Sequence, residues 1–143
     1  NVDGIILAKA GLRRMEMDDL ITQSLSVESF VPSPGQGVLC VECLSQDTEI
    51  MSKIKKIVDL NTEICVSAER IFAAQMDGDC MSPIGAHATI QKDMISITGF
   101  VATVDGTKFI RNKIEGNKNN YKDLSTKLSN LFIKMGSKGI LKC

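Results

Sequence analysis

Cys80 lies where a thiol could act as a nucleophile. The stretch 76–86, MDGDCMSPIGA, places it in a turn rich in Gly, Asp, Ser and Pro, between an apolar helical pattern and an apolar strand pattern. A structural cysteine normally belongs to an apolar pattern, so this position is unusual. An accessible thiol can attack an electrophile and form a thioether, and sulfur is the best such nucleophile at neutral pH. Cys80 is therefore our candidate for covalent chemistry.

A second pair of thiols, Cys40 and Cys43, has the spacing of a metal or redox motif. The pair falls inside a strand pattern, where residues three apart point to opposite faces. No second cysteine pair follows, and His87 is the one histidine that could join this pair. We interpret both thiols as small apolar side chains and predict no metal site. A thiol-redox protein acting through this pair stays open as an alternative hypothesis.

Two further short segments contain residues of the types that bind ligands. Residues 34–37, Pro-Gly-Gln-Gly, resemble a phosphate loop, but such loops follow a strand and open a helix, whereas this one precedes a strand. Its glycines indicate a tight connection or a close approach of backbone to a ligand. Arg13 and Arg14 are adjacent, and from local sequence alone a solvated pair is the simplest interpretation.

The elements that must position these residues follow from hydrophobic periodicity. In the first part, buried strands are predicted over 2–9 and 38–44, and a helix over 49–58 capped by Asp47 or Thr48. A second helix begins near Asp59 or Asn61 and ends at Gly78, with its apolar face on Ile64, Cys65, Ala68, Ile71 and Phe72. Strands over 87–91, 94–104 and 107–115, a hairpin turn at Asp105-Gly106 and a final helix over 121–135 complete the pattern. The second half therefore predicts an α+β domain with a three-stranded antiparallel sheet and helices.

Composition excludes several classes of protein. Lys plus Arg and Asp plus Glu number 17 each in 143 residues, so no net field favours nucleic acid or an anionic membrane. The apolar runs are too short to span a bilayer, and no secretory signal opens the chain. Five cysteines without such a signal predict reduced thiols in the cytoplasm. The first residue is Asn1, which leads at once into a strand pattern, so we expect a chain entered midway.

Several short motifs, taken in order, resemble the porphobilinogen deaminase (hydroxymethylbilane synthase) family. They are DGIILA at 3–8, AGLRR at 10–14, GQGV at 35–38 leading to EC at 42–43, AER at 68–70 and DGDCMSPIG at 77–85. Each motif alone is weak, but their order and spacing over some eighty-five residues make the resemblance specific. The strand, hairpin and helix pattern agrees with it to the C-terminus.

The resemblance implies a role for Cys80, since the family's loop cysteine carries a dipyrromethane cofactor through a thioether. That cofactor primes the addition of four porphobilinogen units with loss of ammonia, giving the linear hydroxymethylbilane. Primer and growing polypyrrole chain carry acetate and propionate groups, which a guanidinium fork binds well. Arg14 falls at the family's carboxylate-binding arginine, while Arg13 remains a solvated residue. Gln36 matches the segment that approaches the cofactor.

Two residues depart from the family pattern. Pro34 stands where a small aliphatic residue is usual and stiffens the Gly-Gln-Gly segment. Asp79 replaces a usual glycine and adds negative charge beside a thiol, which disfavours the thiolate. Neither change removes a functional group.

The resemblance also implies a domain division. Residues 1–33 correspond to the C-terminal end of an α/β middle domain, 34–57 to a crossing segment, strand and helix of the first domain, and 58–143 to the cofactor-bearing C-terminal domain. The family's essential acidic residue belongs to an N-terminal half that this sequence lacks, so we expect no catalytic residue here and no activity from the chain alone. Its expected partners are porphobilinogen, the growing polypyrrole and that half. The alternative is a non-catalytic α+β binding or interaction domain that keeps only the fold.

Overall fold

The computed structural model describes residues 2–77 and 82–141. They form two units, Asn1–Phe30 and Val31–Cys143, and each is described by itself. The first unit contains the short helix α1 (Lys9–Arg14) and the single 3₁₀ turn η1 (Asp18–Leu20). In the second unit, α2 (Thr48–Ile54) continues into the 3₁₀ turn η2 (Lys55–Ile57) before the main helix and sheet begin.

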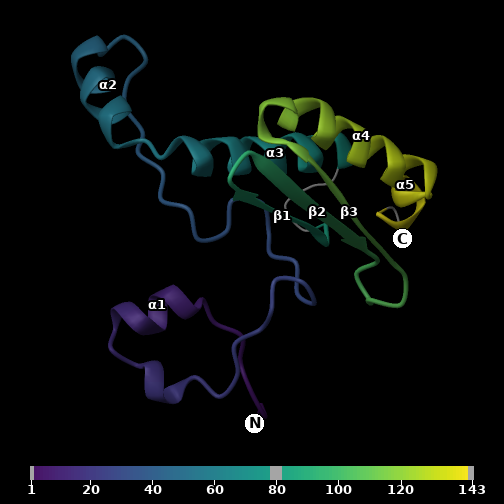
Figure 1. The fold of residues 1–143 in the computed structure, drawn as a ribbon. Coiled ribbons are helices and arrows are strands. Elements are labelled where there is room, and N and C mark those ends of the chain that lie inside the picture. Colours follow the sequence, from purple (N-terminus) through teal and green to yellow (C-terminus); the bar gives the residue numbers. More distant parts are fainter. Residues whose placement is uncertain (1, 78–81, 142–143) are drawn as a thin grey trace. The chain divides into compact units, whose positions relative to one another are not determined.

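The main body of the second unit is a three-stranded antiparallel sheet with two long helices on one face (Figure 1). In chain order its elements are α3 (Leu60–Met76), β1 (Ile84–Gln91), β2 (Met94–Ala102), β3 (Phe109–Asn117), the 3₁₀ turn η3 (Lys118–Asn120), α4 (Tyr121–Lys134) and α5 (Ser137–Ile140). The sheet order is β1-β2-β3. This confirms the predicted α+β domain, its three strands and its two helices.

Two local signals explain where α3 begins and where the hairpin turns. The Asp59 carboxylate accepts a hydrogen bond from the Thr62 N–H at 2.7 Å, which caps α3 and lowers the pKa of Asp59. Gly106 adopts φ +70°, and the Asp105 carboxylate accepts hydrogen bonds from the Thr103 hydroxyl and from the N–H and hydroxyl of Thr107. These bonds lower the pKa of Asp105 to about 2. The predicted start of this helix near Asp59 and the predicted hairpin turn are both confirmed, and so is the predicted cap at Asp47, whose side chain accepts a hydrogen bond from the Ile50 N–H at the start of α2.

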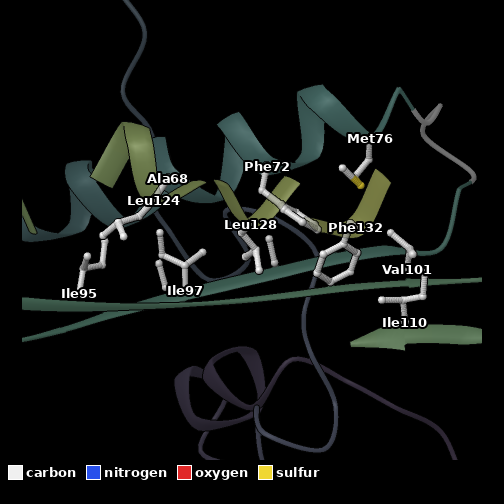
Figure 2. Close-up of a cluster of buried hydrophobic side chains, with 12 residues drawn as sticks. Ala68, Phe72, Met76, Ile95, Ile97, Val101, Ile110, Leu124, Leu128 and Phe132 are labelled. Atoms are coloured by element: carbon white, nitrogen blue, oxygen red, sulfur yellow. The ribbon is translucent and has the colours of Figure 1, made fainter. Parts of the chain in front are cut away.

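The core lies between the helices and the sheet (Figure 2). Fully buried side chains from both helices meet the inward face of β2, where alternate residues point into the core. The rings of Phe72 and Phe132 pack edge to face, with centroids 4.9 Å apart and planes at 81°. A Cβ on Gly99 would lie 2.5 Å from Cζ of Phe72, so this position in β2 has room for the ring because it has no side chain.

The two strands predicted before α3 are not formed. Residues 2–8 and 38–44 contain no strand, and no residue from Val2 to Val58 is buried. Leu39, for example, is 93% exposed. A strand must pair its N–H and C=O groups with a neighbour, and no described part of this chain pairs with either segment. The apolar pattern therefore identified segments suited to a sheet, but sequence periodicity does not supply the neighbouring strand.

The end of α3 also differs in detail from the prediction. The helix ends at Met76, and Asp77 adopts the left-handed conformation with φ +59°. Aspartate enters that region more readily than most residues do, so it can terminate a helix as glycine does. Gly78, where we predicted the end, lies outside the described residues.

No helix in the described part of the chain is both long and apolar enough to cross a membrane.

Candidate functional site

Cys80 lies outside the described residues, and so does Asp79, but the segments before and after them are described. Before them, Met76 ends α3 with its side chain 1% exposed in the core (Figure 2). After them, the Pro83 carbonyl accepts a hydrogen bond from the Ala102 N–H at 3.0 Å, and β1 begins at Ile84. Both flanks of the cysteine loop are therefore held by the main body of the second unit.

The Gly-Gln-Gly segment forms a tight loop. Gly35 and Gly37 have φ values of +75° and +80°, a region that side chains disfavour. The Gln36 N–H donates to the Ser33 carbonyl at 3.0 Å, and the Val38 N–H donates to the Gly35 carbonyl at 3.2 Å. Gln36 itself is exposed, and its side chain makes no hydrogen bond with any residue that the structure describes. The loop therefore presents this amide to the surroundings.

Glu69 joins this loop to the sheet. Its carboxylate is buried, and Oε2 accepts a hydrogen bond from the Gly35 N–H at 2.7 Å while Oε1 accepts one from the Ala88 N–H at 2.8 Å. Nδ1 of His87 lies 3.7 Å from Oε1. Burial of a carboxylate is costly unless its oxygens are bonded, and here each oxygen has a backbone donor. One side chain of α3 thus connects a loop 34 residues earlier with a strand 19 residues later.

A second contact brings the segment before this loop against β1. The Ala86 N–H donates to the Pro32 carbonyl at 2.9 Å. A Cβ on Gly85 would lie 2.8 Å from the Val31 carbonyl oxygen, closer than real Cβ atoms come. Glycine at the end of the Ser-Pro-Ile-Gly motif is therefore required by a close backbone approach.

The two adjacent arginines differ in their contacts. Nε of Arg13 lies 3.1 Å from Oδ1 of Asp18, and both side chains are more than half exposed. Arg14, in the last turn of α1, is exposed and makes no ion pair with any residue in the described ranges. Its guanidinium is thus available to an acidic ligand, whereas that of Arg13 already has a carboxylate partner. Arg14 belongs to the unit Asn1–Phe30 and Gln36 to the unit Val31–Cys143.

The remaining described cysteines form no cluster with other metal ligands. Cys40 and Cys43 are exposed and free, which corrects our expectation that both are buried in a strand. Burial raises the pKa of the Cys65 thiol, and the charges of Glu69 and Asp59 add to that shift. Within residues 2–77 and 82–141, no three His, Cys, Asp or Glu side chains lie close enough to hold a metal ion.

Glu69 is the residue that sequence reasoning missed. It follows Ala68 directly and lies at the border of the apolar face of α3, where a charged side chain normally points to solvent. The available signal was an acidic residue beside the core positions of a helix, inside the Ala-Glu-Arg motif. Periodicity could not reveal its backbone partners, because both lie in other elements.

The second unit is thus an α+β domain of three antiparallel strands and two long helices, to which a buried carboxylate holds a glycine loop. Residues 1–52 match the family model described as porphobilinogen deaminase, dipyromethane cofactor binding domain. Residues 63–134 match the model described as porphobilinogen deaminase, C-terminal domain. The chain belongs to the porphobilinogen deaminase family. Arg14 and Gln36 fall within the first match, and Cys80 falls within the second.

Curated relatives agree with this assignment. The chain is 41% identical over 143 residues to the porphobilinogen deaminase of Staphylococcus aureus, an alignment that covers 98% of this chain and 46% of the relative. It is 38% identical over 141 residues to the enzyme of Desulforamulus reducens, covering 99% of this chain and 46% of the relative. The chain therefore spans about half the length of the curated relatives that it matches.

Proposed function

We propose that this chain carries the dipyrromethane primer of a cytoplasmic porphobilinogen deaminase on Cys80, within a protein that also contains the other half of its relatives' length. The whole protein is then a transferase of tetrapyrrole biosynthesis that joins four porphobilinogen units into hydroxymethylbilane. The bound dipyrromethane supplies the pyrrole end to which these units are added. The observation that supports this most directly is the joint match of both family domains to one chain, with a cysteine in the loop between α3 and β1.

The described residues fit such a primer. Dipyrromethane carries acetate and propionate carboxylates, and the exposed guanidinium of Arg14 has no carboxylate partner among the described residues. A planar guanidinium can bind a carboxylate through two hydrogen bonds. The positive φ values of Gly35 and Gly37 allow backbone to come close to a ligand, and Gln36 offers an uncommitted amide between them. In this proposal, residues 1–33 and 34–57 belong to the middle and first domains, and 58–143 to the cofactor-bearing domain.

The test is the mass of the peptide that contains Cys80. We would build a chimera in which this chain replaces the part of the Staphylococcus aureus relative that it matches, and produce it in cells that synthesise porphobilinogen. We expect the dipyrromethane mass on the Cys80 peptide, and no such mass in the Cys80→Ser variant, because a hydroxyl is a far weaker nucleophile. Cys65→Ser is the matched control and should keep the adduct. The 143-residue chain made alone is expected to have the bare polypeptide mass.

An adduct on Cys40, Cys43, Cys65 or Cys143, or none on Cys80 in an active chimera, would contradict the proposal. A folded chimera with neither adduct nor activity would favour the non-catalytic binding domain.

Arg14 gives a second, independent test in the same chimera. Arg14→Leu should lower turnover by about 10- to 100-fold, because a hydrogen bond to a charged group contributes about 1.5–3 kcal/mol. Arg13→Leu is the matched control, since its partner is Asp18 on the surface, and its turnover should stay near wild type. If Arg14→Leu has wild-type turnover, Arg14, like Arg13, is a solvent-exposed residue that binds no cofactor carboxylate.

A further inference from the structure

The edge of β1 that does not pair with β2 donates hydrogen bonds to two different acceptors. β1 pairs with β2 on one side, and its other side offers the N–H groups of Ala86 and Ala88. The first donates to the Pro32 carbonyl and the second to the carboxylate of Glu69. Unpaired N–H groups on an edge strand are unfavourable when they are shielded from water. The segment before the Gly-Gln-Gly loop and the carboxylate therefore complete this edge together.

The same carboxylate also holds the loop itself, through the Gly35 N–H at 2.7 Å. We propose that Glu69 is a positioning residue, which fixes Gln36 relative to the strand that follows Cys80. This inference rests on the proposed function, because the position of Gln36 matters for activity only if a primer is attached at Cys80. It adds that the Gly-Gln-Gly loop is held to the cofactor-bearing part of the chain, although residues 1–52 match a different domain model.

The chemistry of the side chain is specific to this task. A carboxylate has two oxygens that only accept hydrogen bonds, so it can hold two N–H donors on two segments at once. Glutamine keeps the shape of Glu69 but replaces one oxygen with an NH₂ donor, which would face either Gly35 or Ala88. Aspartate is one methylene shorter and cannot hold both donors without a shift of backbone. Glu69 is only 5% exposed, so water cannot readily replace the lost acceptor.

The geometry of the loop explains how the hydrogen bond between Gly35 and Glu69 can fix the position of Gln36. Gly35 and Gly37 flank it with positive φ values, and the Gln36 N–H is bonded to Ser33. The bond from Gly35 to Glu69 fixes the backbone next to Gln36, while the Gln36 side chain stays exposed. Loss of that bond should therefore change where the amide of Gln36 lies without opening the apolar core.

The test is a double-mutant cycle in the chimera with the Staphylococcus aureus relative. We expect Glu69→Gln and Gln36→Ala each to lower turnover by about tenfold or more. If Glu69 acts by positioning Gln36, the double variant should be no slower than the slower single variant. The melting temperature should fall in Glu69→Gln and in the double variant but stay near wild type in Gln36→Ala, because only Glu69→Gln removes a buried bond. Ile97→Val is the matched control for a loss of stability in the core, and its turnover should stay near wild type.

Two further measurements separate the possible failures. Amide hydrogen exchange at Gly35 should accelerate in Glu69→Gln but not in Ile97→Val, whatever the activity. If Glu69→Gln does not fold, Gly35→Ala replaces it, because its φ of +75° strains the loop while the added carbon meets no atom within 4 Å.

Absence of the Cys80 adduct in the wild-type chimera would refute the proposed function, and with it the role of Gln36 toward the primer. With the adduct present, multiplicative losses of turnover in the double variant, or unchanged exchange at Gly35, would refute the positioning role of Glu69 alone.

Discussion

Replacing Phe72 by alanine should remove much of the stability of the helix-and-sheet body. Its side chain is fully buried, and its ring meets that of Phe132 edge to face with centroids 4.9 Å apart. Truncating a buried phenylalanine to alanine costs about 3–5 kcal/mol through lost burial and the cavity left behind. The aromatic pair contributes about 0.5–1.5 kcal/mol beyond its buried area. The truncation removes this pair together with the buried area, so the expected total cost is about 3–5 kcal/mol.

This loss is large relative to the total free energy of unfolding of the helix-and-sheet body. At about 0.05–0.15 kcal/mol per residue, the roughly 80 residues from α3 to α5 have a free energy of unfolding of about 4–12 kcal/mol. The variant should lose at least about a quarter of it. With a slope of about 1–3 kcal/mol per molar urea, the unfolding midpoint should fall by about 1 M or more at unchanged slope.

Urea unfolding of the chain, followed by the helical circular dichroism signal, measures this change. Phe109→Ala is the matched control, since Phe109 is 64% exposed and its ring stacks on Phe100 with centroids 6.0 Å apart. Its cost should stay below about 1 kcal/mol. A Phe72→Ala curve that superposes on wild type would refute the assignment of the core face of α3.

Gly99 allows a sharper version of the same test. Its added Cβ would lie 2.5 Å from Cζ of Phe72, so Gly99→Ala should be destabilising by about 1–3 kcal/mol in the wild-type background. In the Phe72→Ala background the obstructing ring is gone, and the same change should cost less. Equal costs in the two backgrounds would contradict the close approach of the Phe72 ring to Gly99.

Two other changes test local features of the fold. Hydrogen bonds lower the pKa of Asp105 to about 2 from its usual 3.8, so its stabilisation is present above about pH 4 and is lost as the pH falls through 2. Asp105→Asn should therefore be less stable than wild type near neutral pH, with the difference in urea midpoint shrinking in acid; a difference that does not vary with pH would contradict this reasoning. Gly85→Ala should lower the free energy of unfolding by about 1–3 kcal/mol, because its Cβ would meet the Val31 carbonyl at 2.8 Å. Gly11→Ala, whose added carbon meets nothing within 4 Å, is the control, and equal unfolding midpoints for the two variants would show that Val31 does not approach Gly85.

Sequence patterns predicted the helix-and-sheet body well because its elements carry local signals. The apolar spacing of α3 and α4, the start of α3 near Asp59 and the turn at Asp105-Gly106 can each be read within a window of a few residues. The strands predicted over 2–9 and 38–44 failed for a physical reason, since an apolar run becomes a strand only beside a partner. The family motifs placed Arg14, Gln36 and Cys80 as cofactor-binding residues, and those three roles stay predictions.

By itself, the sequence determined the periodicities, the turns and the order of family motifs, because each of these is a property of neighbouring residues. Only the tertiary structure revealed that Glu69 accepts hydrogen bonds from both Gly35 and Ala88. It likewise decided that Gly85 must be a glycine, since the carbonyl of Val31 comes too close for a side chain. Such contacts join residues 19 to 54 positions apart, and no local pattern encodes which distant backbone group will be brought to a carboxylate or a glycine.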